Sequence, residues 1–526
     1  MTAFNGRQSG SFGWFCLRDL PWYPLALAAY VVLALYAQNV QVVSPWLVMR
    51  PLVLIVFGTS ALYLLVFLVL RDWHRAGLVV AALLLATFSW GHFVRFVVPP
   101  NLIFYKTRFF VGYASVVSAF LFYVWRRKRT FQRWTYPLNV SCTALLVWSI
   151  GLVATSPTCR SSFAMHFLQP AEAKTPSPAS VRDGHSGYPD IYLIVLDSYP
   201  RDDVLWQHFG FRNDNFIRWL QSNGFYVVKS SRSNYNKSLW SLASCFNMDY
   251  LHVLLPACSP SDRNIADLLS LFRHNRLFSL LRSHGYRILA FRTGFDYLDL
   301  DREADIYLSP AEPIANTFEM MLLELTPIPR ILARIGGSES MFAHHRRRIL
   351  FTFNQLSDLS QYCETGPLFV YAHVICPHEP IVFDEDGQAV RLQDFFMLGA
   401  ARPSWVPFSD YAAAYIAQLK FVNRMTIRVV KSLSTNDVVA IVSDHGLLNP
   451  EKGDRSTTLK NFMAVRIPAD KSSPESLNNL RSLVNLFPVV IRAAFGVIVP
   501  FQADESYFVE WDHPYRYQRC APNLLE

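Results

Sequence analysis

The stretch Asp190-Ile-Tyr-Leu-Ile-Val-Leu-Asp197 decides the fold class of the second part of the chain. Six consecutive apolar residues lie between two carboxylates. A continuous apolar run of this length predicts a strand that is buried on both faces of a parallel sheet. Two similar runs follow, at 368–372 and 438–442. Helical patterns lie between the runs, at 214–222, 345–359 and 411–433, so we expect a doubly wound α/β sheet.

Polar residues follow each of these three runs. Asp197 follows the first, His373 the second, and Ser443-Asp444-His445-Gly446 the third. Ligands of open α/β sheets bind beyond the carboxyl ends of the strands, so we expect these side chains to converge on one crevice. An Asp and a His side by side can hold a divalent ion, and Gly446 allows a sharp turn away from them. The alternatives are that Asp444 caps a turn and that Asp197 caps the following helix, although Asp202 and Asp203 are better placed for that role.

A second group of candidates surrounds Ser238. The segment 233–244 indicates a polar loop that enters a helix, where free backbone N–H groups favour a phosphate or sulfate group. A bound divalent ion would make the Ser238 hydroxyl a nucleophile; otherwise Ser238 is only a helix cap. Lys237 contacts the anion or is solvated. His378 is expected to contact the transferred group or protonate the leaving oxygen, and His373 to bind substrate or to play a structural role.

The first part of the chain has the composition of a membrane domain. Apolar residues make up 52% of the whole chain and charged residues only 17%, and the deficit of charge is concentrated before residue 157. Stretches of about 20 apolar residues predict five transmembrane helices, at 22–40, 46–70, 76–98, 109–125 and 137–155. Basic residues gather in three of the flanking segments: Arg7, Arg18, Arg71, Arg75, Arg126, Arg127, Lys128, Arg129 and Arg133. These segments belong in the cytoplasm, so everything after residue 157 is expected outside it.

We therefore expect a transmembrane domain at 1–156, a Pro- and Ser-rich linker at 157–189, and an α/β domain at 190–526. The net charge of +9 reflects membrane topology, and no basic stripe with interleaved aromatics suggests nucleic-acid binding. An oxidising compartment favours disulfides, with Cys245–Cys258 and Cys363–Cys376 as the nearest candidate pairs. The actual pairing stays open.

Taken together, these motifs resemble the alkaline phosphatase superfamily. The branch in question is that of membrane-bound sulfatase-like proteins such as lipoteichoic acid synthase and the phosphoethanolamine transferases. The resemblance covers roughly residues 188–508 and rests on the Asp197, Ser238, Pro377-His378 and Ser443–Gly446 motifs. It implies an alkaline-phosphatase-like α/β domain and one divalent ion held by Asp197, Ser238, Asp444 and His445. It also implies a covalent intermediate on Ser238, with His378 contacting the transferred group.

Two departures from these relatives matter. Ser238 stands where Thr is usual, and no second histidine follows the Asp-His pair between 447 and 468, unlike in the phosphoethanolamine transferases. The expected function is phosphotransfer or phosphodiester hydrolysis on a lipid-linked or cell-envelope glycan substrate, at the outer side of a bacterial inner membrane. The alternatives are a sulfatase and a non-catalytic envelope scaffold. Mn²⁺, Mg²⁺, Ca²⁺ and Zn²⁺ all remain possible, and the oligomeric state stays open.

Overall fold

The computed structural model describes residues 20–97, 106–127, 131–156, 187–311, 315–329, 339–359, 366–390, 406–448, 454–471 and 474–525, with a few single positions between these ranges. Most of the expected linker (157–186), with Arg7, Arg18, Lys128, Arg129 and Cys363, lies outside them. The chain divides into two compact units. The first comprises Met1–Arg160 and Met321–Pro327, and the second comprises Ser161–Met320 and Ile328–Glu526.

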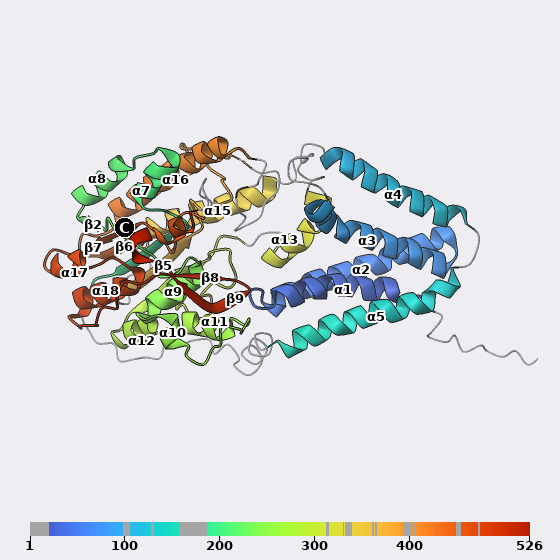
Figure 1. The fold of residues 1–526 in the computed structure, drawn as a ribbon, viewed down its shortest axis with the longest axis horizontal. Coiled ribbons are helices and arrows are strands. Elements are labelled where there is room, and N and C mark those ends of the chain that lie inside the picture. The colour runs from blue at the N-terminus through green and yellow to red at the C-terminus, as the bar shows by residue number, and fades with distance from the viewer. Residues whose placement is uncertain are drawn as a thin grey trace, which may run out of the picture. The chain divides into compact units, whose positions relative to one another are not determined.

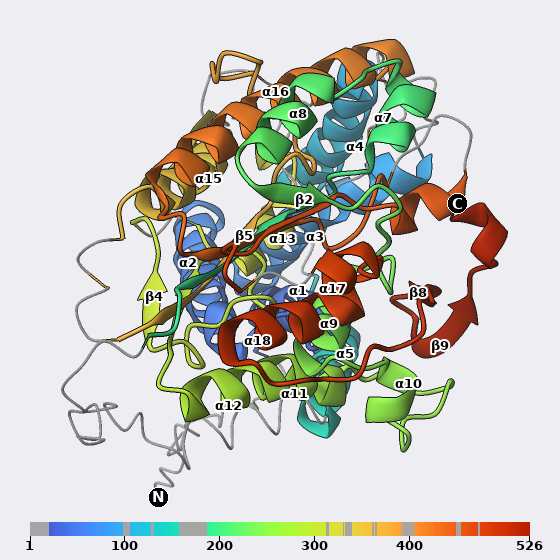
Figure 2. The same cartoon turned by 90° about the vertical axis from the view of Figure 1, so that its left-hand side faces the viewer.

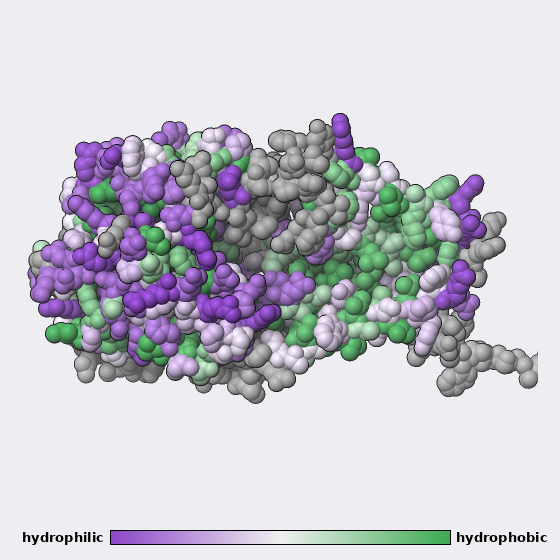
Figure 3. Space-filling view, in the orientation of Figure 1, coloured by the Kyte–Doolittle hydropathy of each residue, from purple (hydrophilic) through white to green (hydrophobic). Residues whose placement is uncertain are grey.

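The first unit contains five apolar helices (Figure 1). They are α1 (Tyr23–Asn39), α2 (Pro45–Leu70), α3 (Trp73–Val97), α4 (Lys106–Arg126) and α5 (Gln132–Thr155). Among the described residues, four helices, α2 to α5, are long and apolar enough to cross a membrane. Helix α1 has 17 residues, at the short end of the spanning range. Figure 3 shows apolar side chains gathered over this unit. The chain is thus a multi-pass membrane protein with an α-helical membrane domain.

Hydrogen bonds of polar side chains connect these helices at a few positions. The indole N–H of Trp22 donates to Thr143 Oγ1 at 3.1 Å, and Asn139 Oδ1 accepts from the backbone N–H of Tyr23 at 3.0 Å. Such bonds satisfy polar groups that could form no hydrogen bond with the hydrocarbon of the bilayer. The segment 321–327 also belongs to this unit: the backbone N–H of Gly91 donates to Leu325 O at 2.9 Å. A Cβ at Gly91 would lie 2.8 Å from Glu324 O, so glycine permits the close approach.

The second unit is built on a seven-stranded sheet with the order β2-β7-β6-β1-β5-β3-β4. The strands are β1 (Ile191–Leu196), β2 (Phe225–Val227), β3 (Arg287–Phe291), β4 (Ile306–Leu308), β5 (Leu368–Val374), β6 (Val438–Val442) and β7 (Met463–Arg466), with a separate hairpin of β8 (Tyr507–Glu510) and β9 (His513–Arg519). The strands β6, β1, β5, β3 and β4 are parallel. Strand β7 runs antiparallel to β2 and β6, so the sheet is mixed.

Helices cover both faces of this sheet (Figure 2). On one side lie α7 (Asp202–Phe209), α8 (Asp214–Ser222), α15 (Glu339–Leu356) and α16 (Phe408–Ser432). On the other lie α9 (Ser238–Asn247), α11 (Ala266–Arg273), α12 (Arg276–Ser283) and α18 (Leu486–Phe495). The remaining helices are α10 (Leu251–Leu254), α13 (Thr317–Glu324) and α17 (Pro474–Asn478).

Alternation along the strands explains the two layers of the core. Ile194 of β1 and Val370 of β5 belong to the cluster that packs against α15 and α16. On the opposite face Phe369 packs against Phe278 of α12, with ring centroids 5.9 Å apart. Every residue of β1, β5 and β6 is buried. This is the pattern that continuous apolar runs predict for central strands.

One expectation about the cysteines is wrong. Cys245 and Cys258 are both free thiols, so the suggested disulfide between them is absent. Cys245 is buried on α9, whereas Cys258 follows α10 and lies beside Asp267, with Sγ 3.6 Å from Oδ2. Cys376 is also a free thiol, and its suggested partner Cys363 lies outside the described residues. Closeness in sequence did not place these side chains together in the fold.

Candidate metal centre

The three central strands bring the predicted side chains to one edge of the sheet. In the parallel pairing, Val195 of β1 lies opposite His373 of β5 and Val442 of β6. Asp197 and Asp444 therefore both lie just beyond a strand end. His373 was expected after its strand, but β5 continues through it to Val374. Its side chain consequently projects from the strand itself.

Asp197, Asp444 and His445 form the centre of the cluster. His445 Nε2 lies 3.5 Å from Asp197 Oδ1 and 3.6 Å from Asp444 Oδ2. The Nδ1 of His445 lies 2.9 Å from Gly446 O. Since a carbonyl can only accept, Nδ1 carries a proton, and in the neutral ring Nε2 keeps its lone pair. The nitrogen that faces the carboxylates is thus available as a ligand.

His378 joins this cluster from the segment after β5. Ligand atoms of Asp197, His378 and His445 all lie within 4.8 Å of one another. The Nδ1–H of His378 donates to Glu379 O at 2.7 Å, which again leaves Nε2 unprotonated in the neutral ring. Glu379 is itself buried, and its carboxylate accepts from the Tyr411 hydroxyl at 2.6 Å.

His373 lies behind the two carboxylates. Its Nε2 is 3.1 Å from Asp197 Oδ2 and 3.8 Å from Asp444 Oδ2, and the histidine and both aspartates are completely buried. On its other side, Nδ1 lies 3.4 Å from the Tyr371 hydroxyl. Tyr371 in turn packs edge-on against Phe246 of α9, with ring centroids 5.4 Å apart. This contact joins β5 to the helix that begins with Ser238.

Two carboxylate oxygens in this cluster have no hydrogen-bond partner among the described residues. They are Asp197 Oδ1 and Asp444 Oδ2, both completely buried. Burial alone would raise the pKa of Asp197, but the three neighbouring histidines outweigh it and hold that pKa well below its usual range. Buried carboxylates without partners are costly unless a cation is bound. The separations of 3.5 and 3.6 Å also agree with the roughly 3.4 Å expected between tetrahedral ligands of an ion such as Zn²⁺. These residues fit a divalent cation.

Backbone geometry holds the ligands in place. Ser198 has a positive φ of 58° directly after Asp197, and its hydroxyl donates to Gly446 O at 3.2 Å. A Cβ at Gly446 would lie 2.1 Å from Thr457 O and 2.5 Å from Lys460 O. The turn was expected to need glycine for its sharpness. The structural reason is that the backbone of 457–460 passes too close for any side chain.

Ser238 is the first residue of α9 and is partly exposed, as is Lys237. Among the described residues no group hydrogen-bonds to the Ser238 hydroxyl, so it is available to react. Partial burial, and secondarily the positive charge of Arg455, lowers the pKa of Lys237. The sequence placed both residues at a helix start, and the structure agrees.

A loop that we did not predict lies beside the centre. Strand β3 runs parallel to β5, so the segment after Phe291 reaches the same edge of the sheet. Burial, and then the negative charges of Asp197 and Asp444, raise the pKa of Tyr297 in this loop. The signal was present in the sequence, because 288–291 is a short apolar run followed by polar residues.

No family model matches the sequence, and no curated protein matches it. Among solved structures, it is similar to the C-terminal periplasmic domain of EcEptC from Escherichia coli in complex with Zn (10% identity, 63% of this chain, 92% of that chain, TM-score 0.40). It is also similar to lipooligosaccharide phosphoethanolamine transferase A from Neisseria meningitidis, an integral membrane protein (12% identity, 91% and 94%, TM-score 0.35). A third is the lipoteichoic acid synthase LtaP from Listeria monocytogenes (15% identity, 62% and 80%, TM-score 0.38).

Proposed function

We propose that this chain is a membrane-anchored, metal-dependent phosphotransferase or phosphodiesterase that uses a covalent intermediate on Ser238. The observation that supports this most is the pair of buried, unpartnered oxygens of Asp197 and Asp444 facing His445 Nε2. The Ser238 hydroxyl at the start of α9 supplies the nucleophile. The resemblance of these motifs to the alkaline phosphatase superfamily points to the same chemistry.

A divalent ion would be held by Asp197, Asp444 and His445, with the Ser238 oxygen as the proposed fourth ligand. When bound, a divalent cation stabilises negative charge on oxygen and lowers the pKa of a hydroxyl. His373 is better explained as a positioning residue than as a substrate contact, because it is completely buried behind both carboxylates. Its Nε2–H donates to Asp197 Oδ2 and leaves Oδ1 directed to the ion.

In the first step, Ser238 Oγ attacks phosphorus, forms an O–P bond and releases its proton to solvent, while the bond from phosphorus to the leaving oxygen breaks. Protonated His378 gives a proton to that oxygen, which departs as an alcohol. In the second step, water or an acceptor alcohol attacks the phosphoryl group and gives its proton to His378. The bond between Ser238 Oγ and phosphorus then breaks, and Ser238 takes up a proton from solvent. Lys237 contributes a positive charge at the start of α9.

The proposed substrate is lipid-linked or belongs to a cell-envelope glycan, because the chain that carries the site also carries membrane helices. The basic segments Arg71–Arg75 and Arg126–Arg133 favour a cytoplasmic location for those loops, which puts the α/β domain on the periplasmic or extracellular side of a bacterial inner membrane. We expect the membrane and the substrate as partners, and no nucleic acid.

The test is to purify the full chain in detergent, measure its metal content, and assay phosphodiester, phosphomonoester and sulfate-ester substrates. We expect about one divalent ion per chain and turnover of the phosphodiester. Ser238→Ala should abolish turnover and Ser238→Thr should retain part of it, whereas Ser259→Ala, in an exposed turn, should change nothing. Full turnover by Ser238→Ala would exclude the proposed nucleophile.

The sulfatase alternative makes a different prediction in the same assay. It requires release of sulfate and, in the formylglycine type, a modified nucleophile. The Cys258-Ser-Pro sequence that resembles a formylglycine motif follows α10 and not the start of α9. Mass spectrometry of the peptide containing Ser238 should show an unmodified serine. The scaffold alternative predicts that the purified chain binds no divalent ion.

A further inference from the structure

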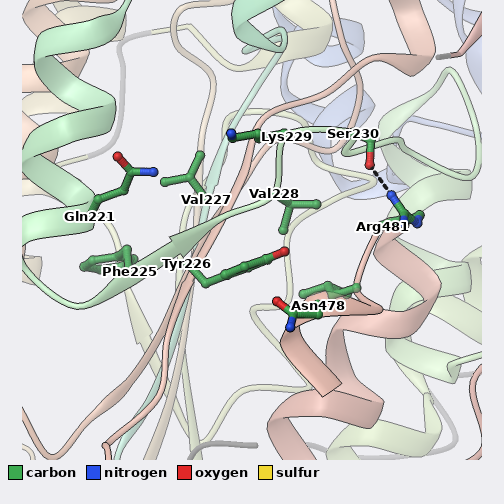
Figure 4. A pocket seen from close by; sticks show the side chains of 10 residues that line it. Gln221, Phe225, Tyr226, Val227, Val228, Lys229, Ser230, Asn478 and Arg481 are labelled. Atoms are coloured by element: carbon green, nitrogen blue, oxygen red, sulfur yellow. Dashed lines mark hydrogen bonds between the residues drawn. The ribbon is translucent and has the colours of Figure 1, made fainter. Parts of the chain in front are cut away.

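A cavity of about 420 Å³ lies along the outermost strand, β2. Its lining comes from the end of α8, from β2 and the residues after it, and from the segment after α17 (Figure 4): Gln221, Phe225, Tyr226, Val227, Val228, Lys229, Ser230, Asn478, Leu480 and Arg481. Among the described residues strand β2 pairs with β7 alone, so none of the described strands lies along its other edge. None of these residues belongs to the metal centre.

The walls of this cavity are fixed by the fold. Phe225, Val228 and Leu480 are buried, at 4%, 4% and 1% exposure. The backbone N–H of Arg232 donates to Arg481 O at 2.8 Å, and that of Val228 donates to Met463 O at 2.9 Å. The cavity is therefore preformed, as binding sites for small ligands usually are.

The cavity has an excess of positive charge. Lys229 and Arg481 line it, and none of the ten lining residues is acidic. Arg481 Nη1 donates to Ser230 Oγ at 2.7 Å (Figure 4), and neither cation forms an ion pair with a described carboxylate. By contrast, Lys420 on the surface is paired with Glu385 at 2.8 Å. Two cations without acidic partners beside a cavity favour an anionic ligand.

The other lining groups suit a sugar. Tyr226 offers a partly exposed ring, and Gln221 and Asn478 offer amides that both donate and accept hydrogen bonds. In the view of Figure 4 the Tyr226 side chain is drawn between Gln221 and Asn478. An aromatic ring with amides and two cations matches a saccharide that carries carboxylate or phosphate groups.

The position of the cavity relates it to the metal centre. Strand β2 is antiparallel to β7, which is antiparallel to β6, so β2 runs in the same direction as β1. Lys229 and Ser230 thus follow the carboxyl end of β2, at the edge where Asp197 follows β1. Three inter-strand steps of about 4.8 Å place β2 roughly 14 Å from β1 across the sheet. One phosphate group cannot span that distance, but an oligosaccharide can.

We propose that this cavity is a subsite for an anionic saccharide unit of an extended substrate whose reacting group lies at the metal centre. The role as a substrate subsite rests on the proposed function, whereas binding of the saccharide does not. The ligand class is a sugar bearing carboxylate or phosphate, held by Lys229 and Arg481 and packed against Tyr226.

Calorimetric titration of the full chain in detergent with trigalacturonate tests this, with neutral maltotriose and tripolyphosphate as comparison ligands. We expect trigalacturonate to bind about tenfold or more tightly than either. The double variant Lys229→Gln/Arg481→Gln should weaken binding about tenfold or more, and Tyr226→Leu should weaken it too. The matched control is Lys420→Gln/Arg424→Gln, which removes two exposed, paired cations and should leave affinity unchanged.

Several results would overturn the inference: no binding of trigalacturonate, equal binding of maltotriose or tripolyphosphate, or equal loss in the control variant. The thermal midpoint of the double variant should match that of the unmodified chain, which shows that any loss is not unfolding. Ser238→Ala should bind trigalacturonate normally. Binding without turnover in the unmodified chain would therefore reject only the proposed function, and turnover without binding would reject only the subsite.

Discussion

Asp197 Oδ1 and His445 Nε2, from the ends of different strands, lie 3.5 Å apart, and in the neutral histidine ring neither atom carries a proton. The His445 proton is on Nδ1, where it is donated to Gly446 O. Two lone pairs that face each other in a buried site repel, and the separation is too long for a good hydrogen bond. A cation bound between them would be coordinated by both atoms, and this would remove the repulsion.

Removal of the metal should destabilise the α/β domain. Chelation leaves the buried charges of Asp197 and Asp444 without a cation. With the free ion about 100-fold above its Kd, binding contributes about 2.7 kcal/mol, so EDTA should lower the thermal midpoint by several degrees. Adding back the native ion should restore it. A midpoint unaffected by EDTA and by added ions would show that the carboxylates hold no metal.

Asp444→Asn should weaken metal binding while largely keeping the shape of the site. The change removes the charge of one unpartnered oxygen, so affinity should fall by more than the roughly 10–100-fold typical of outer-shell changes. Equilibrium titration with competing chelators measures this directly. Asp470→Asn, at an exposed position of the same domain, should retain full affinity. Unchanged affinity in Asp444→Asn would exclude this carboxylate as a ligand.

His373→Gln tests the positioning role. Loss of the Nε2–H that bonds Asp197 Oδ2 at 3.1 Å should weaken metal affinity about 10–100-fold, with kcat falling more than KM changes. Gln can offer a donor, so His373→Gln should retain more affinity than His373→Leu. Tyr371→Phe should have a smaller effect, and His252→Gln none. A rise in KM alone, with metal affinity intact, would instead support a substrate contact.

Gly446→Ala should distort the metal turn. The added Cβ would lie 2.1 Å from Thr457 O, which is backbone and cannot move away cheaply. We expect a loss of about 1–3 kcal/mol in stability, together with weaker metal binding. Differential scanning fluorimetry and metal titration give the two readouts. Gly187→Ala is the matched control, since a Cβ there meets nothing within 4 Å.

Asp437 should make stability depend on pH. Burial, and then the charge of Asp190, raise its pKa from 3.8 to about 6. The folded chain therefore keeps this proton between pH 4 and 6 after the unfolded chain has lost it, so stability falls as pH rises through that window. Asp437→Asn should remove the loss of stability that this group causes between pH 4 and 6. At pH 7 it should therefore stabilise the domain by about 1–2 kcal/mol, after allowance for solvent screening. Thermal midpoints measured from pH 4 to 7 should converge at the acid end, and Asp470→Asn should follow the unmodified curve.

Much of the architecture could be predicted from local patterns. The runs at 191–196 and 438–442 match β1 and β6, because a strand buried on both faces needs apolar residues at every position. The same logic placed Asp197, Asp444 and His445 at one edge, since parallel strands end together. The membrane helices could be predicted because lipid imposes composition over a whole span.

Other features depend on contacts between distant segments, which no local pattern encodes. His373 could not be distinguished from a substrate contact without knowing that β5 continues through it and that both carboxylates lie before it. The antiparallel direction of β7 follows from the path of the chain rather than from the four residues of the strand. The free thiols of Cys245 and Cys258 likewise reflect where α9 and the segment after α10 lie.

The return of residues 321–327 to the first unit changes how the two units are connected. The chain passes between them at three places: near residue 160, before 321 and after 327. A protease that cuts the linker would release residues 1–160 from their covalent link to the rest of the chain, but not from their contacts with residues 321–327. A shortened chain that begins after the linker would carry a segment whose partner, Gly91, is missing. The linker is therefore not the only connection between the two parts of the chain. Residues 321–327 lie between two segments of the α/β domain in sequence, but they pack with the membrane helices.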